Sequence, residues 1–301
     1  MSSQFDRHHE QHHSHHHHHH SHHHNHSNHA ATFLDREQMT FVQNHPPGNN
    51  QVRIFIQGNY RYIIANGIPN HAIGAFTNAI KQQNYYFRIP AKPHIAEQIT
   101  ELRRQPFGVA INGVVFDPEA AEFWNGERHS GWRYEALSGK MSFGLDTNNA
   151  HVRSNGAYHY HGLPVGLIPN LGNDQRMLLI GYAADGFPVY AEYGYSDPNN
   201  CDSKVRKMRS SYRLKQGQRP SGPGKQYDGT FVQDYEYVSG AGDLDECNGR
   251  FGVTPEYLKG IYHYYITEEF PFISRYLRGT PDTSFQRRGR DSKQGSASAP
   301  I

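Results

Sequence analysis

The 301-residue sequence has no long apolar run: none approaches the roughly 18 residues that a membrane-spanning helix requires. We therefore expect no membrane span. The N-terminus also lacks the apolar segment of a signal peptide. Positive and negative charges nearly balance, with a formal net charge of +2 at pH 7. This balance predicts no nucleic-acid partner. The compartment and the oligomeric state stay open.

The sequence also contains little cysteine. Cys201 and Cys247 are the only two, which excludes a disulfide framework. They can form one bridge in an oxidising compartment or remain free thiols in a reducing one. Phosphate-binding Gly loops, dinucleotide fingerprints and Gly-x-Ser-x-Gly elbows are also missing. The chemistries that depend on those motifs have no support here, and whether the protein is an enzyme stays open.

Aromatic residues and glycine are abundant, with 20 Tyr, 16 Phe and 29 Gly. Together with 17 Pro, they predict short strands joined by tight turns rather than a helical bundle. The expected fold is mainly β with minor helices, an α+β class. We expect one compact β-rich domain over residues 33–285, between a disordered His-rich segment at 1–32 and a disordered polar tail at 286–301.

Fifteen of the 23 histidines lie between His8 and His29. This tract has almost nothing apolar to bury, and its imidazoles will bind Zn, Ni or Cu loosely. Its irregular flanks favour a natural tract over a purification tag, although six consecutive residues match such a tag: His15, His16, His17, His18, His19 and His20.

Several local patterns predict secondary structure. Alternation around Gly58-Asn59 predicts a hairpin, and Asn112-Gly113 and Asp185-Gly186 predict turns between buried strands. Two short helices are expected at Ile95–Arg104 and Glu119–Trp124. Eight Lys or Arg with no acidic residue among them, from Lys204 to Lys225, predict an exposed loop; a phosphate-contacting patch is the alternative.

The segment Tyr158-His159-Tyr160-His161 alternates as a strand does, so His159 and His161 share one face. Two imidazoles at i and i+2 can bind one metal ion. Asn155-Gly156 is a turn that can fold His151 back beside them, which makes it the preferred third ligand.

Further ligand candidates are His263, His129 and Asp185, the last as a ligand or as the acceptor that fixes a histidine tautomer. The alternative is a buried Tyr/His cluster that needs no metal. Residues 156–161 recur loosely as 260–265, although no full-length repeat is evident. These two segments are expected to pair or to lie face to face.

An acidic turn follows at Asp243–Gly249. Its alternating carboxylates resemble the front of a calcium loop, but position 12 of such a loop is Thr254 rather than an acid. Calcium is therefore less favoured than Cu or Zn.

Six blocks in order resemble the YHYH-domain family: residues 66–71, 112–118, 149–151, 156–162, 185–190 and 243–249. The resemblance covers residues 52–280. It implies an uncharacterised, mostly bacterial and mostly exported family whose motif suggests metal binding. Carried over, the matching positions are His151, His159 and His161, followed by His71, Asp185 and Glu246. This chain departs from the family in starting with a His tract and in having Tyr265 where a second His is expected.

Three functions follow as hypotheses. The favoured one is a protein that binds Cu or Zn through His151, His159 and His161. The alternative is a structural or binding module without metal. The third is a metal-dependent hydrolase, which needs Asp185 or Glu246 within reach of a metal-bound water.

Overall fold

The computed structural model describes residues 44–172 and 175–287. The His-rich tract, with its residues His15–His20, lies outside this part, as does the predicted tail from residue 288 onward. Among the described residues there is no helix long and apolar enough to cross a membrane. Both cysteines are free, Cys201 exposed and Cys247 buried.

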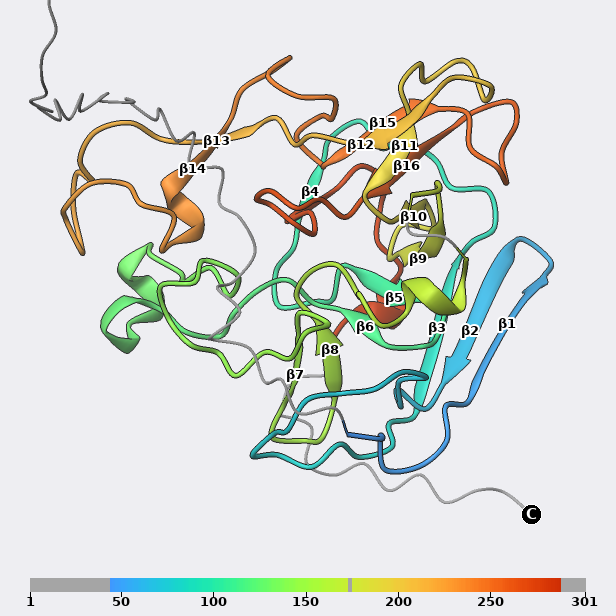
Figure 1. Ribbon diagram of the computed structural model, residues 1–301, viewed down its shortest axis with the longest axis horizontal. Coiled ribbons are helices and arrows are strands. Elements are labelled where there is room, and N and C mark those ends of the chain that lie inside the picture. The colour runs from blue at the N-terminus through green and yellow to red at the C-terminus, as the bar shows by residue number, and fades with distance from the viewer. Residues whose placement is uncertain (1–43, 173–174, 288–301) are drawn as a thin grey trace, which may run out of the picture. The chain divides into compact units, whose positions relative to one another are not determined.

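The protein is mainly β, as predicted. A three-stranded antiparallel sheet has the order β1-β2-β3, with bounds Val52–Gln57, Tyr60–Ala65 and Tyr85–Pro90. An eight-stranded sheet has the order β15-β16-β10-β9-β5-β6-β8-β7 (Figure 1). Its strands are β5 (Gly108–Ala110), β6 (Val115–Phe116), β7 (Ala150–Val152), β8 (Tyr158–Tyr160), β9 (Leu179–Ala183), β10 (Pro188–Tyr190), β15 (Gly249–Gly252) and β16 (Ile261–Tyr265).

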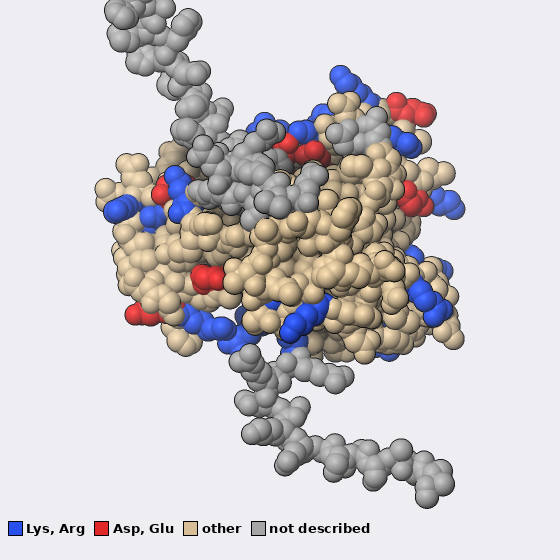
Figure 2. Space-filling view, turned by 60° about the horizontal axis from the view of Figure 1, so that its bottom comes forward, with Lys and Arg blue, Asp and Glu red and all other residues tan. Residues whose placement is uncertain are grey.

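Three strand pairs complete the β structure: β4 (Thr100–Glu101) with β17 (Tyr276–Leu277), β11 (Tyr193–Tyr195) with β12 (Val205–Lys207), and β13 (Tyr212–Leu214) with β14 (Tyr235–Tyr237). The helical segments of the described chain are single 3-10 turns: η2 (Trp124–Gly126), η3 (Arg128–Ser130), η4 (Ile168–Asn170), η5 (Val232–Asp234) and η6 (Thr283–Phe285). On the face drawn in Figure 2, charged side chains lie mostly near the edges, and uncharged residues fill the middle.

The three predicted turns are confirmed. Gly58-Asn59 joins β1 to β2, Asn112-Gly113 joins β5 to β6, and Asp185-Gly186 joins β9 to β10. Residues 204–225 are only in part the predicted exposed loop, because they include β12 and β13 and because Arg219 is buried. Arg206, Lys207 and Arg219 form ion pairs with Asp and Glu side chains.

The two predicted helices are wrong. Over residues 95–104 the chain forms β4 instead, because the amides of Ala96 and Leu102 donate to the carbonyls of Arg278 and Arg275. Ile99 and Leu102 pack against the core from this extended segment, whereas Ile95 is exposed. Residues 119–124 are irregular, and the only turn there is η2, which begins at Trp124.

The eight-stranded sheet consists of two equivalent halves. From the centre outward the first runs β5-β6-β8-β7 and the second β9-β10-β16-β15, and in each the three pairings are antiparallel, parallel and antiparallel. At the centre β5 and β9 pair symmetrically, with Val109 opposite Tyr182. The sheet therefore has an approximate twofold axis through this pair.

The repeated sequence segments occupy equivalent places in the two halves. The prediction that they pair is wrong, because β10, β9, β5 and β6 lie between β16 and β8. Equivalent contacts recur: Tyr158 donates to Asp146 in the first half, and Tyr262 donates to Asp245 in the second. One supersecondary unit therefore occurs twice, although the sequence reveals the repeat only in short blocks.

A single large hydrophobic cluster joins both sheets. It contains Ile63 and Ile89 from the three-stranded sheet together with Val109, Phe116 and Ile180 from the eight-stranded sheet, all fully buried. This packing fixes β8 and its neighbours on a rigid support, which positions the histidines described next.

Candidate metal centre

The β7–β8 hairpin places two histidines opposite each other. His151 is in register with His159, so the two side chains lie on the same face of the sheet. The turn includes Gly156 at φ +86°, where a Cβ would lie 2.5 Å from that of Lys81, so only glycine fits there without a shift. His161 follows two residues after His159 and returns to the same face.

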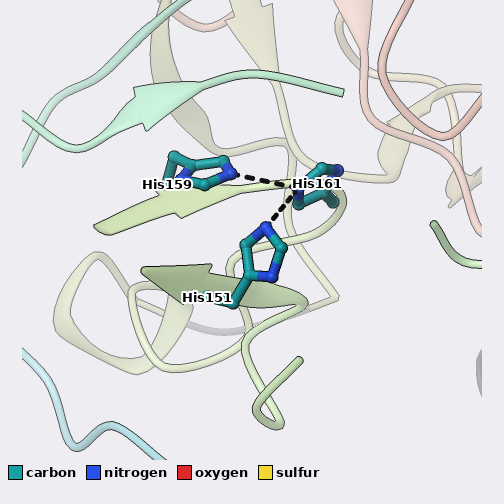
Figure 3. Close-up of side chains that lie close together, drawn as sticks. All are labelled: His151, His159 and His161. Carbon is teal, nitrogen blue, oxygen red and sulfur yellow. Dashed lines mark hydrogen bonds between the residues drawn. The ribbon is translucent and has the colours of Figure 1, made fainter. Parts of the chain in front are cut away.

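The three rings point their Nε2 atoms toward one another (Figure 3). Nε2 of His161 lies 3.1 Å from Nε2 of His159 and 3.1 Å from Nε2 of His151. All three ligand atoms lie within 4.8 Å of one another, and no other group of three or more His, Cys, Asp or Glu in residues 44–172 and 175–287 converges in this way. Ligands at 2.0–2.1 Å in a tetrahedral site stand about 3.4 Å apart, so the two separations of 3.1 Å are close to those of a metal site.

The opposite nitrogen of each ring is held by the backbone. Nδ1 contacts a carbonyl oxygen at 2.8 to 3.1 Å in every case: that of Phe143 for His151, of Ala157 for His159 and of Pro118 for His161. A carbonyl only accepts, so each Nδ1 must carry the proton and donate it. Each Nε2 is then the unprotonated atom, which is the tautomer that binds a metal.

Burial keeps these imidazoles neutral. His159 and His161 are buried and His151 is half-buried. Burial lowers the pKa of all three, and the positive charge of Arg153 acts in the same direction on each. The hydrogen bonds to backbone carbonyls oppose this lowering, as do Glu122 and Asp146 at His151. Three lone pairs therefore converge on one point with no proton between them, an arrangement that a cation would stabilise.

A cavity of about 310 Å³ reaches His159. Its wall includes Asp117, whose carboxylate is paired with both Arg153 and Arg287. Burial raises the pKa of Asp117, and the two guanidinium groups oppose that rise. The cavity thus brings a charged cluster to His159, but it does not border His151 or His161.

The equivalent place in the second half has a different set of side chains. Nε2 of His263 lies 2.8 Å from the hydroxyl of Tyr265, and Arg250 stands opposite His263 in register, where the first half has His151. Here a hydroxyl proton satisfies the lone pair. His263 is therefore a structural residue in this arrangement, and it does not join the other three.

Two further predicted residues are engaged elsewhere. Nε2 of His71 contacts the hydroxyl of Tyr160, on the face of β8 opposite to the three histidines. Asp185 is buried and accepts hydrogen bonds from Tyr264 and from the amides of Gly279 and Phe187. Burial raises its pKa to about 6, against the effect of these hydrogen bonds.

The remaining candidates also lie apart from the three histidines. Glu246 is 3.9 Å from Arg278, and His129 lies exposed on η3. In the acidic turn, Asp243 is paired with Arg206 and Asp245 with Arg278. The carboxylates expected of a calcium loop are thus already bonded to arginines.

Some residues of the centre were not anticipated from the sequence. The carbonyls of Pro118 and Phe143 orient two of the rings, and a backbone carbonyl gives no sequence signal. Asp146 is fully buried and accepts from the amides of Asn148 and Ala150, which shapes the turn ahead of His151. The spacing Asp-x-Asn was visible in the sequence and is typical of such a turn.

Comparison with known proteins bears on the whole sheet. No curated protein and no solved structure matches the chain. The model of one family, described as YHYH protein, matches residues 86–279, which is more than half of the chain and includes both halves of the eight-stranded sheet. The chain therefore belongs to the YHYH family.

Proposed function

We propose that this protein binds one transition-metal ion, Zn²⁺ or copper, through Nε2 of His151, His159 and His161. The observation that carries the proposal is the convergence of three unprotonated Nε2 atoms while all three Nδ1 atoms donate to carbonyls. Three neutral imidazoles suit zinc and copper. The cavity of about 310 Å³ borders His159 and His151 is half-buried, so exchange or a further ligand would reach bound metal from beside these two residues.

The second half of the sheet supports this proposal by contrast. At His263 the fold satisfies the same ring position with a hydroxyl from Tyr265. If the three histidines were purely structural, we would expect a hydroxyl to donate to Nε2 in the first half as well. The first half instead has a third histidine and no hydroxyl donor to any of the three Nε2 atoms among the described residues.

Sequestration or sensing fits these groups better than hydrolysis. The hydrolase hypothesis required Asp185 or Glu246 beside the metal-bound water. Asp185 is bonded to Tyr264, and Glu246 lies near Arg278. We further propose that the N-terminal His-rich tract, which lies outside the described residues, collects metal loosely and passes it to this site.

Metal-dependent unfolding tests the proposal. The chain shortened to residues 31–301, the larger compact unit, is stripped with EDTA, dialysed and melted with and without Zn²⁺ or Cu²⁺. A ligand at 100 times its Kd adds about 2.7 kcal/mol to stability, which raises Tm by about 5–10 °C at this size. Elemental analysis should give one metal per chain.

His151→Gln is the matched variant, because His151 is only half-buried and its loss leaves two ligands. It should lose both the bound metal and the shift in Tm. His94→Gln is the control, since His94 is exposed and outside the centre. If His151→Gln binds and responds to metal as His94→Gln does, the three histidines are a structural cluster and the proposal is wrong.

A further inference from the structure

A large cavity of about 680 Å³ lies apart from the three histidines. It lies between β4 and β17, the segment of η2 and η3, and the β13–β14 pair. This volume is within the range of small-molecule sites. None of the functions considered so far uses it.

The wall of this cavity is strongly basic. Two carboxylates, Glu101 and Glu119, stand against six cationic side chains: Arg103, Arg104, Arg128, Arg133, Lys215 and Arg275. Arg133 is paired with Glu119, and Arg275 with Glu135 behind the wall. Arg103, Arg104 and Arg128 have no ion pair within the described residues. Unpaired cations around a concave, low-dielectric surface attract an anion.

Aromatic rings form the other part of the wall. Phe270 is stacked on Tyr235 with centroids 4.0 Å apart and an interplanar angle of 4°, and Tyr212 meets Phe270 edge-on at 5.5 Å. Phe123 lies under the guanidinium groups of Arg128 and Arg133, at 5.9 and 4.6 Å. A planar or apolar group therefore finds a matching surface beside the cations.

Arg104 links this cavity to a smaller one. It adopts φ +59°, a left-handed conformation that is unfavourable for a residue with a Cβ. Its side chain lines both the large cavity and a neighbouring one of about 70 Å³. Strained backbone of this kind concentrates at ligand sites.

We propose that the large cavity binds a small organic anion, with its carboxylate or phosphate at Arg104 and Arg128 and its planar part against the aromatic wall. The proposal does not depend on metal binding. The smaller cavity shares Arg104 and Arg128 with the large one, and shares Asp117 and Arg153 with the cavity that reaches His159. A bound anion would thus lie in a row of cavities that leads toward the histidines.

Calorimetric titration of the metal-free full chain in EDTA tests the proposal. The probes are phenyl phosphate, benzoate, inorganic phosphate and phenol. Phenyl phosphate or benzoate should bind saturably, and the tighter of the two identifies the anionic group. Inorganic phosphate should bind at least about tenfold more weakly, because it lacks the ring, and phenol should not saturate the site. Equal binding of phenol and the anionic probes would overturn the proposal.

Arg104→Gln and Arg128→Gln each remove one charge from an exposed side chain. A hydrogen bond to a charged group is worth 1.5–3 kcal/mol, so each variant should weaken binding by about ten- to a hundredfold. Arg53→Gln is the matched control, since Arg53 is exposed, has no ion pair in the described chain and lies 5.5 Å over Phe55 outside the cavity. Thermal melts verify that all three variants fold. Equal affinity of Arg128→Gln and Arg53→Gln would also refute the assignment.

Discussion

Replacing Asp146 by asparagine tests how the fold holds His151 in place. Asp146 is fully buried and accepts five hydrogen bonds. Its Oδ1 atom receives the amides of Asn148 and Ala150. Its Oδ2 atom receives the amide of Gly74, the side-chain amide of Asn148 and the hydroxyl of Tyr158.

The size of the effect follows from these bonds. In Asp146→Asn the new NH₂ group takes the place of Oδ2 and accepts nothing. The hydroxyl of Tyr158 can rotate and accept, and the side-chain amide of Asn148 keeps the carbonyl of Ala72 and the hydroxyl of Tyr158 as acceptors. The buried amide of Gly74 loses its acceptor. One buried unsatisfied donor predicts a loss of about 1–3 kcal/mol. The turn ahead of His151 should loosen, and metal affinity should fall at least about tenfold.

The second half of the sheet supplies a matched control. Asp245 is equivalent to Asp146, but it is partly exposed and its partners include Arg278. Asp245→Asn should cost about 1 kcal/mol and leave metal affinity unchanged. Urea unfolding and metal titration measure both quantities. The reasoning fails if Asp146→Asn is as stable as wild type, or if both variants lose metal affinity equally.

Three other expectations concern stability and reactivity. Since burial raises the pKa of Asp185 to about 6 in the folded state, from an ordinary value of 3.8, folding retains its proton between those values. The contribution of Asp185 to stability should fall by up to about 3 kcal/mol as pH rises from 4 to 7. The destabilisation caused by Asp185→Asn should therefore shrink over that range. A difference in unfolding free energy between wild type and variant that does not change with pH would contradict this. Phe285→Ala should lower the free energy of unfolding in urea by about 3–5 kcal/mol, because the ring of Phe285 is buried and stacked in the core. Phe251 is exposed, so Phe251→Ala should change the stability by less than about 0.5 kcal/mol. Similar losses in the two variants would be inconsistent with this packing. A thiol reagent should label exposed Cys201 in the native protein and reach buried Cys247 only after unfolding. Labelling of both cysteines at the same rate in the native protein would contradict the burial of Cys247.

The mainly β class and the main hairpins were predictable from local pattern. Asn-Gly and Asp-Gly pairs between alternating segments specify tight turns through their own backbone preferences. The two predicted helices failed because their backbone groups found partners in distant segments, as Leu102 does with Arg275. Local propensity does not encode such partners.

Local pattern alone places His159 and His161 on one face, because side chains alternate along any strand. It also identified His151 through the turn signal of Asn155-Gly156. These features depend only on neighbours along the chain.

What those histidines face depends on segments that are distant in the sequence. The parallel pairing of β6 with β8 brings the carbonyl of Pro118 to His161, and a loop brings that of Phe143 to His151. Those carbonyls fix the tautomers and turn three Nε2 atoms toward one point. The twofold relation of the sheet also emerges only in three dimensions, whereas Tyr265 in the place of a second His was already visible in the sequence. The three Nε2 atoms meet only if the strands lie in this order, and contacts between residues far apart in the sequence set the strand order.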